Sequence, residues 1–342
     1  MIYSDIGCQF LVFFLLLGTV FGDLSLEWDK FKRDYNKQYK TVAEENQRKQ
    51  IFIENVNRMR AFQQNHPDAT FTVGINYLMD RRIEELASGT KLPRGIRSVS
   101  HEKPINVKDL PETVDWRVKG VISSVFTDKI GFDVTAVVST ELVETLYAIE
   151  TGQLIKGSIS QIFDCCPQPT DAFDCIQKNT SGICRDSDYP ATLGSCNLNI
   201  CKPFATFDKI NRLEGKNEET MKAWIQESTL WAELNTVGEG FQEYTKGIYD
   251  VPSCTEGPID YVVQIVGYGV EANKPYWICK HSWGKDWGEN GYFRIARGKN
   301  MCRIAENVVQ VANPKKSDGV RQSNFISIPI VLIVALVSRM IN

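Results

Sequence analysis

The stretch from Asp128 to Glu144, DKIGFDVTAVVSTELVE, contains the start of a predicted helix where a secreted hydrolase of this size could carry its nucleophile. The first helical residue is Val134, whose side chain has neither a proton to donate nor a lone pair with which to attack. Covalent hydrolysis needs an activated hydroxyl, thiol or carboxylate with a base within hydrogen-bond reach. The nearest hydroxyls are those of Thr135 and Ser139, and His281 is the only histidine that follows residue 101. The sequence therefore predicts a buried helix of the kind that can carry a nucleophile at its start, but with a valine in place of the nucleophile.

The bulk composition excludes several classes of protein. The 342 residues are 43% hydrophobic, which is ample for a core, and the net charge is −3. Acidic and basic residues are interspersed, so no basic stripe indicates a nucleic-acid partner. Ten cysteines, nine of them between Cys165 and Cys302, are spaced like a disulfide framework and not like a CxxC metal site, so neither a metal nor a cofactor is implied. An odd number in that region predicts at least one free thiol.

Both ends of the chain carry apolar segments. Residues 1–22 are predicted to be a secretory signal peptide, with a buried first helix as the alternative. Residues 313–324 are polar, and residues 325–342 are mostly apolar. Small residues such as Ser317, a polar spacer and an apolar tail match the signal for a lipid anchor, which predicts attachment to a membrane at Ser317. A membrane-spanning tail and a strand of a soluble domain are the alternatives.

The order of the elements predicts an α+β fold. Residues 24–65 are predicted to be helical, with a capping box from Thr41 to Glu44, and residues 86–109 have the composition of a linker. A second helix is predicted over residues 133–152, capped by Asp133 and ended by Gly152. Its buried face is predicted to hold Val134, Val137, Val138, Leu142, Leu146 and Ile149. From about residue 203, alternating apolar runs separated by Gly and Pro predict antiparallel strands.

Several motifs together resemble those of the papain-like cysteine peptidases. LPETVDWRVKGVISSV resembles the start of their mature domain, and SWGKDWGENGYFRI resembles their Asn-Ser-Trp-Gly segment. The upstream helix resembles their inhibitory prosegment at Glu44, Arg48, Ile51, Phe52 and Asn55, and GINYLMD resembles its second motif. The resemblance implies a prosegment over residues 23–109 and a papain-like domain over 110–312. That domain would have two subdomains, one helical and one resembling an antiparallel β-barrel.

The four positions that carry the chemistry of that family are changed here. The resemblance places Val134 at the nucleophile, Asp128 at the oxyanion glutamine, Tyr261 at the base and His281 at the orienting asparagine. Valine cannot attack, and tyrosine, with a reference pKa of about 10, is a poor base near neutrality. An ionised aspartate accepts hydrogen bonds and repels an oxyanion. These changes predict a protein without peptidase activity, with His281 partly buried beside two tryptophans.

The resemblance also implies part of the covalent framework. Cys254 is expected to pair with Cys302, and Cys165 or Cys166 with Cys196 or Cys201. Cys279 is the candidate for the free thiol because it lies in an apolar, strand-like run. Asn179 begins an Asn-Thr-Ser glycosylation sequon, which export would make usable.

The function predicted from these features is binding by a secreted or cell-surface papain-like homologue that is not an enzyme. Its partner is expected to be a protein, such as a cysteine peptidase or the substrate of one, with the lysosome as the alternative location. Two other functions stay open: an active cysteine-type endopeptidase with a non-standard site, and an inhibitor of cysteine peptidases that acts through the prosegment. Purified protein tested on peptide substrates would separate the first two.

Overall fold

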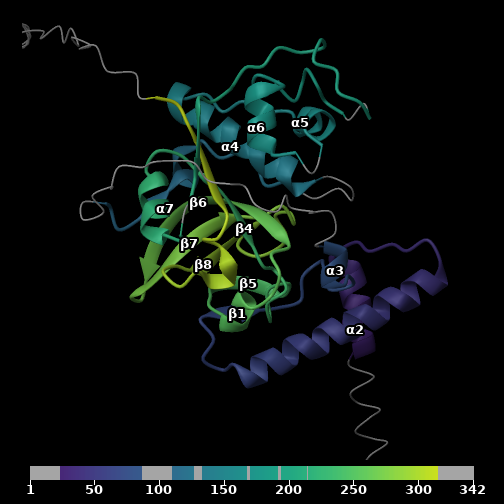
Figure 1. The fold of residues 1–342 in the computed structure, drawn as a ribbon. Coiled ribbons are helices and arrows are strands. Elements are labelled where there is room, and N and C mark those ends of the chain that lie inside the picture. Colours follow the sequence, from purple (N-terminus) through teal and green to yellow (C-terminus); the bar gives the residue numbers. More distant parts are fainter. Residues whose placement is uncertain are drawn as a thin grey trace, which may run out of the picture. The chain divides into compact units, whose positions relative to one another are not determined.

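The computed structural model describes residues 24–86, 110–126, 133–167, 170–191, 194–213 and 215–314 (Figure 1). The predicted signal peptide (1–22), Asp128, Ser317 and the apolar segment 325–342 lie outside these ranges. Of the predicted polar linker 313–324, only the first two residues are described. Within these ranges, no helix combines the length and the apolar character that crossing a bilayer requires.

The N-terminal region consists of two helices, a short strand and a further helical turn. Residues 24–34 are helical, α2 spans Val42–Asn65, β1 spans Phe71–Val73 and α3 spans Ile83–Leu86. The prediction of helix over residues 24–65 is wrong for the residues between the two helices, because Asn36 adopts a positive φ of 48°. The predicted capping box is present in a shifted form. The Thr41 side chain accepts from the Glu44 N–H, and the Glu44 carboxylate accepts from the N–H of Lys40 and not from that of the cap itself.

The helix that begins at the predicted nucleophile position is α4, Val134–Thr151. Its start is fixed by Asp133, whose carboxylate accepts from the Thr135 N–H, and its end by Gly152 in the left-handed conformation. Both caps were predicted from the sequence. The helix is buried on more sides than one apolar face would require, because the sheet packs on it as well as other helices. It therefore belongs to the centre of the molecule.

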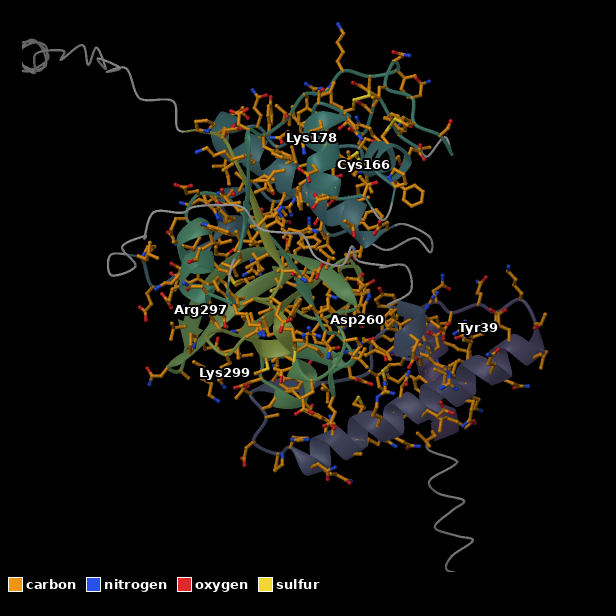
Figure 2. All side chains as sticks on the ribbon, viewed as in Figure 1. Tyr39, Cys166, Lys178, Asp260, Arg297 and Lys299 are labelled. Carbon is orange, nitrogen blue, oxygen red and sulfur yellow. A yellow bond between two sulfur atoms is a disulfide. The ribbon has the colours of Figure 1, made fainter. Side chains whose placement is uncertain are left out.

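Two shorter helices pack near α4, and each of them carries a cysteine of one disulfide. These are α5, Ile159–Cys165, and α6, Ala172–Lys178 (Figure 1). Disulfides join Cys165 to Cys196, Cys166 to Cys175 and Cys184 to Cys201. The yellow sulfur bonds lie near the labelled Cys166 in Figure 2. Of the alternatives open for Cys165, Cys166, Cys196 and Cys201, the structure forms the Cys165–Cys196 pair. The expected Cys254–Cys302 bond is also present, away from these helices.

The described strands form one mostly antiparallel sheet. Its order is β1-β5-β8-β7-β6-β4-β9-β3, and β2 pairs with β6. The pairs in the centre are antiparallel as predicted, but β5 and β8 run parallel. The strands beyond β1 are β2 Val114–Asp115, β3 Lys209–Arg212, β4 Leu230–Leu234, β5 Tyr244–Tyr249, β6 Tyr261–Glu271, β7 Lys274–Lys280, β8 Tyr292–Ala296 and β9 Val308–Ala312. Helices come first and strands later, which confirms the α+β class.

The remaining helical elements lie around the sheet. They are α7, Glu218–Trp224, and three short 3-10 helices, η2 Trp116–Lys119, η3 Pro252–Thr255 and η4 Met301–Arg303. The Gln264 side chain of β6 donates to the Glu141 carbonyl, to the Thr145 hydroxyl and to the Thr229 hydroxyl. This buried amide bonds the central strand to the middle of α4 and so links the helix to the sheet.

Candidate active site

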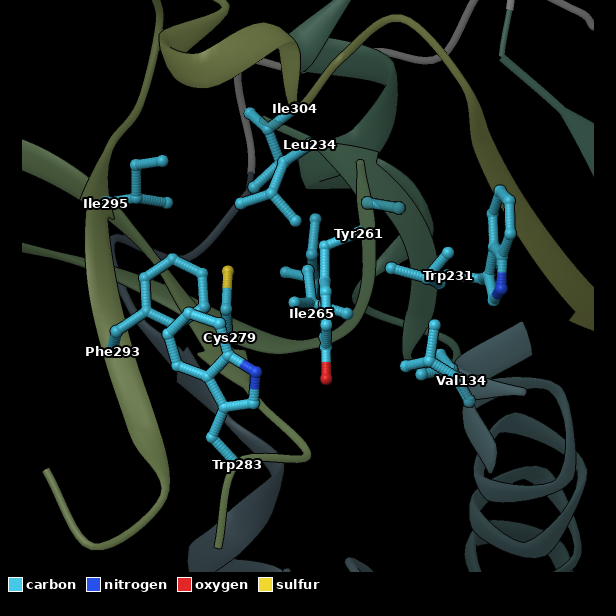
Figure 3. Close-up of a cluster of buried hydrophobic side chains, with 14 of the residues drawn as sticks. Val134, Trp231, Leu234, Tyr261, Ile265, Cys279, Trp283, Phe293, Ile295 and Ile304 are labelled. Carbon is cyan, nitrogen blue, oxygen red and sulfur yellow. The ribbon is translucent and has the colours of Figure 1, made fainter. Parts of the chain in front are cut away.

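The predicted nucleophile position is occupied by the hydrocarbon side chain of Val134. Its side chain is buried at the start of α4 in the same hydrophobic cluster as Tyr261 of β6 (Figure 3). Figure 3 also shows Cys279 and Trp283 in this cluster. Asp128, predicted at the oxyanion position, lies outside the described residues. Val134 therefore contributes packing at this site and no reactive atom.

His281 is an interior aromatic residue and not an accessible base. It follows β7 directly, and 2% of its surface is exposed, so the prediction of partial burial is wrong in degree. Its ring stacks on Tyr261 with centroids 4.4 Å apart, and Trp283 and Trp287 lie at 4.3 and 4.9 Å. Neither ring nitrogen has a hydrogen-bond partner among the described residues. Burial in this aromatic shell lowers the pKa of His281 well below its ordinary value, so the ring is neutral.

The hydroxyl groups near the start of α4 do not form a dyad with His281. Thr135 has a buried hydroxyl oxygen without a partner in the described structure, whereas Ser139 donates to the Ala136 carbonyl one turn earlier. The ring of His281 stacks instead on that of Tyr261. A threonine nucleophile activated by His281 is therefore not formed in this structure.

A different hydroxyl pair is formed at the site. The Tyr261 phenol oxygen and the Ser282 hydroxyl oxygen lie 2.5 Å apart, and both residues are buried. A nucleophile and its base typically lie about 2.6–3.2 Å apart, and this pair is slightly closer than that range, so the two oxygens are within hydrogen-bond reach. Ser282 was not among the site residues predicted from the sequence. Its place directly after His281 in KHSW was the available signal, but the contact with β6 arises only from the fold.

Cys279 does not offer a substitute thiolate. It is the free cysteine of the described chain, and it is fully buried in β7, as its apolar surroundings predicted. Burial raises the pKa of its thiol well above the ordinary value. A protonated, inaccessible thiol is unreactive. The described residues also contain no cluster of three or more side chains suited to bind a metal ion.

A buried charge cluster lies beside this site, between α4 and β7. The Lys280 ammonium is 2.8 Å from the Glu141 carboxylate, and the two side chains are 1% and 8% exposed. Lys280 also donates to the Ser123 hydroxyl at 3.2 Å. One turn along α4, Glu144 accepts from the Gly157 N–H at 2.6 Å. Two carboxylates thus face one ammonium in the interior, and burial raises the pKa of Glu144 to about 7.

The titration of Glu144 predicts a fold that is more stable in acid. The pKa of its carboxyl is higher in the folded chain than its reference value of 4.5, so folding is favoured while this group stays protonated. This contribution is complete below pH 4.5 and is lost as pH rises to about 7, for a total of about 3 kcal/mol. Urea unfolding at pH 4.5 and 7.5 checks this. The Glu144→Gln variant can keep the bond to Gly157, and we expect its stability to change less over this interval. An equal pH dependence in both proteins would contradict the assignment.

The N-terminal region packs directly on the sheet domain near this site. Strand β1 pairs with β5, and the Asn76 amide donates to the Gln242 carbonyl at 2.8 Å. The Tyr77 hydroxyl donates to the carbonyl of Trp283, the residue after Ser282. The segment predicted as a prosegment is therefore bonded to the loop that carries Ser282.

Comparisons with known proteins identify both parts of the chain. Residues 110–312 match the model of the papain family cysteine proteases, and residues 28–86 match the cathepsin propeptide inhibitor domain (I29). The chain is 30% identical to digestive cysteine proteinase 2 of Homarus americanus over 309 residues, which are 85% of this chain and 95% of that protein. It is 31% identical to mouse cathepsin S (Mus musculus) over 303 residues, which cover 82% of this chain and 88% of that protein.

Solved structures give the same result for the fold. The recombinant stem bromelain precursor superposes with a TM-score of 0.74 at 27% identity, over 85% of this chain and 99% of that one. The digestive procathepsin L2 proteinase from the larval midgut of Tenebrio molitor gives a TM-score of 0.74 at 26% identity, over 84% and 99%. The predicted papain-like fold of two subdomains with a helical prosegment is confirmed.

These relatives correct the functional prediction. The prediction that the chain is not an enzyme is wrong, because its relatives over most of its length are named as cysteine proteinases and cathepsins and the matching family is enzymatic. The prediction rested on four side chains, and it gave them more weight than the agreement of the whole chain with active peptidases. Such peptidases, with propeptides and disulfides, belong to the secretory pathway, the lysosome or the extracellular space. The chain belongs to the papain family of cysteine proteases and carries a cathepsin-type propeptide inhibitor domain in front of the protease domain.

Proposed function

We propose that this chain is the precursor of an endopeptidase with a non-standard active site. The observation that carries the proposal is the consecutive match of a propeptide domain and a protease domain, in the order found in the proteinase precursors that resemble it. In the precursor the prosegment bonds to the loop after β7, beside the hydroxyl pair. Release of the prosegment would open this face to polypeptide substrates.

The reaction that fits these residues is acyl transfer through an oxygen nucleophile. Both residues are buried in the precursor, so the reaction requires that the prosegment has left and that the Tyr261 phenol, with a reference pKa of about 10, has been ionised at alkaline pH. The Ser282 hydroxyl oxygen then attacks the peptide carbonyl carbon, and its proton passes to the phenol oxygen of Tyr261, 2.5 Å away. Tyr261 returns that proton to the leaving amine as the peptide C–N bond breaks. A water molecule then releases the acyl group from Ser282. Because a phenol accepts a proton only when it is ionised, the rate is expected to increase with pH.

The experiment is a peptide-hydrolysis assay before and after removal of the prosegment. The full chain is secreted from a eukaryotic host, and a specific cleavage sequence placed within residues 87–109 allows an added protease to cut there. We expect hydrolysis to appear once the prosegment has dissociated, and to persist after treatment with a thiol-alkylating reagent. Loss of activity on alkylation would show that a thiol, and not Ser282, is the nucleophile.

A second candidate function is inhibition of other cysteine peptidases by the released prosegment. It is supported by the match of residues 28–86 to an inhibitor domain and by an internally bonded prosegment, in which Arg48 pairs with Glu85 at 2.7 Å. The partner would then be a cysteine peptidase. The test is to add the prosegment, released from the cut precursor, to an active papain-like enzyme. No inhibition at a tenfold molar excess would contradict it.

The position within the secretory pathway is a further part of the proposal. Asn179 is exposed at the end of α6, which suits a glycan at its sequon. A lipid anchor at Ser317 would hold the protein at the cell surface. Treatment of expressing cells with a phosphoinositide-specific phospholipase should release the protein into the medium, and digestion with an N-glycosidase should increase its mobility on a gel. An Asn179→Gln variant is the control for the glycan.

A further inference from the structure

The turn formed by residues 78–81 of the prosegment presents a set of main-chain carbonyls to side-chain donors. The Asn55 amide donates to the carbonyls of residues 79 and 81 at 2.9 and 2.8 Å. The Arg48 guanidinium donates to the carbonyl of residue 80 at 3.1 Å. Both side chains come from α2, so the prosegment holds this turn by its own residues. Arg48 and Asn55, seven residues apart on α2, therefore bind the same turn.

One side chain of the protease domain also binds this turn. Gln242 lies between β4 and β5 and is 3% exposed in the precursor. Its Nε2 atom donates to the carbonyls of residues 78 and 81 at 3.0 and 2.9 Å. Its Oε1 atom accepts from the Arg58 guanidinium of α2 at 3.1 Å. Both amide N–H groups and the amide oxygen are therefore bonded to the prosegment.

Glu243, the next residue, adds a charge to the same contact. Its carboxylate is 2.7 Å from the Arg58 guanidinium and 2% exposed. Burial raises the pKa of Glu243, and Arg58 opposes this rise. When the prosegment leaves, the Gln242 side chain loses three partners, which are the carbonyls of residues 78 and 81 and the Arg58 guanidinium, and Glu243 loses its counter-ion. Water replaces these partners only after release, so a substituted side chain that cannot make the same bonds weakens the complex, where the polar groups are buried.

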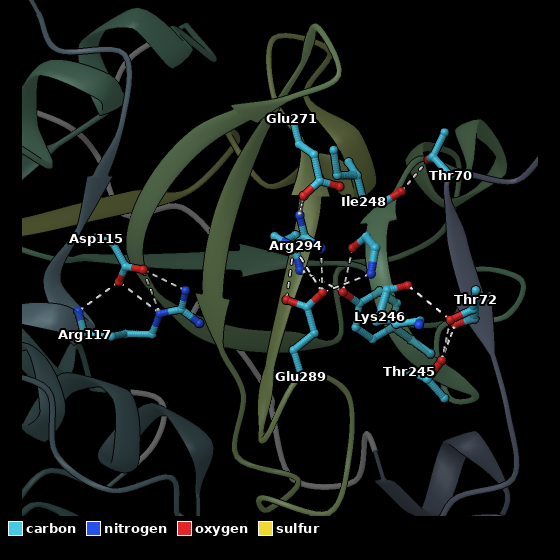
Figure 4. A network of polar contacts seen from close by, with 12 residues as sticks. Thr70, Thr72, Asp115, Arg117, Thr245, Lys246, Ile248, Glu271, Glu289 and Arg294 are labelled. Carbon is cyan, nitrogen blue, oxygen red and sulfur yellow. Dashed lines mark hydrogen bonds and ion pairs between the residues drawn. The ribbon is translucent and has the colours of Figure 1, made fainter.

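The strand pairing at this interface does not distinguish one prosegment from another by itself. Strand β1 adds to the edge of β5 through main-chain bonds, and the hydroxyl of the exposed Thr72 lies 2.6 Å from that of the half-buried Thr245 (Figure 4). The Thr70 hydroxyl donates to the carbonyl of Ile248. Main-chain pairing of this kind gives affinity, and specificity has to come from side-chain contacts.

We propose that Gln242 determines which prosegment the protease domain binds. Its amide nitrogen binds two carbonyls of a turn that are three residues apart, and its amide oxygen binds an arginine beside that turn. Glu243 forms an ion pair with the same arginine. The partner is a prosegment that offers both features, either its own or that of a related precursor supplied in trans. This inference rests on the proposed inhibitory role of the prosegment but not on the identity of the nucleophile.

The test measures how fast the prosegment leaves the protease domain. The full-length protein with the cleavable sequence within residues 87–109 is immobilised through the protease domain and cut. Release of the prosegment is then followed for the wild type and for Gln242→Glu. The substituted carboxylate has nearly the same shape but presents oxygen to the two turn carbonyls. We expect release to be about 30-fold faster or more, because two hydrogen bonds are lost and a carboxylate oxygen is placed against the carbonyl oxygens of residues 78 and 81.

Thr245→Val is the matched control, because it removes side-chain bonds to the same prosegment at a half-buried position whose partner, Thr72, is exposed. We expect release to change by less than about threefold, since water replaces exposed partners. Before cutting, the covalent tether keeps the prosegment at high effective concentration, which favours folding of the variants. Arg58→Met removes the bonds from the prosegment side and should accelerate release even if Gln242→Glu fails to fold.

Two results would overturn the inference. One is release from Gln242→Glu, or from Arg58→Met where the first variant does not fold, at the wild-type rate. The other is an equally large effect of Thr245→Val. Peptide hydrolysis is measured in the same samples. If the peptidase proposal fails, hydrolysis is absent in every variant while the difference in release rates remains, so the two failures are distinguishable.

Discussion

Replacing Ser282 with alanine is expected to reduce peptide hydrolysis by the prosegment-free protein about a thousandfold or more. The substitution removes the oxygen that lies 2.5 Å from the Tyr261 phenol, and Val134 offers no alternative nucleophile at the start of α4. Loss of the nucleophile in a covalent mechanism leaves only binding and background hydrolysis. The measurement is kcat/KM for a fluorogenic peptide, at equal concentration of folded protein.

Two matched variants make this result specific. Thr135→Val removes a buried hydroxyl at the start of α4 with little change of shape, and Cys279→Ala removes the buried thiol. Neither residue has a role in the proposed reaction, so turnover per folded molecule is expected to stay within about threefold of the wild type. If Thr135→Val lost as much turnover as Ser282→Ala, the nucleophile would be Thr135 and not Ser282.

Replacing Lys280 with methionine is expected to destabilise the folded protein by about 3–5 kcal/mol. The variant removes the ammonium that is 2.8 Å from Glu141 and leaves that carboxylate buried without a counter-ion, close to Glu144. Breaking one side of a buried pair costs more than the pair contributes, because the remaining charge has lost both water and its partner. Urea unfolding at pH 7.5 measures the change.

The double variant Lys280→Met/Glu141→Leu provides the control for this prediction. It removes both charges and fills the space with apolar groups, and such replacements of a whole buried pair are often neutral or stabilising. We expect it to recover most of the stability lost in the single variant. An additive, larger loss in the double variant would show that the cluster stabilises the protein by packing and not by charge compensation.

Much of the fold could be predicted from local chemistry. The limits of α4 follow from Asp133, which accepts from the Thr135 N–H, and from Gly152, which adopts the left-handed conformation that glycine favours. The break between the first two helices could not be predicted, because it depends on Asn36 in a conformation that the sequence pattern does not require. The parallel pairing of β5 with β8 was missed for a similar reason, since strand order is a property of the fold.

The candidate site was predicted less well than the fold. Family resemblance located Val134, Tyr261 and His281, and the structure places Tyr261 and His281 in ring contact. Family resemblance did not predict that aromatic rings would enclose His281. The enclosure depends on the path of the loop after β7, which places the Trp283 and Trp287 rings against His281. Ser282, the partner of the Tyr261 phenol, was also not predicted, because its contact with β6 arises only from the fold.

The disulfide framework shows the same limit. The resemblance indicated the Cys254–Cys302 pair and left alternatives for Cys165 and Cys166, whereas the Cys184–Cys201 pair was not anticipated. Connectivity among several nearby cysteines does not follow from their spacing alone. The Cys166–Cys175 pair, which joins the end of α5 to α6, was not anticipated either, because it depends on how these two helices pack.

The most direct measurement is hydrolysis of a peptide library by the wild-type protein after its prosegment has been cut and removed. Mass spectrometry of the products identifies any cleaved bond. The account predicts cleavage that survives thiol alkylation, increases with pH and disappears in Ser282→Ala. A folded, prosegment-free preparation that cleaves no peptide at any pH would contradict the account.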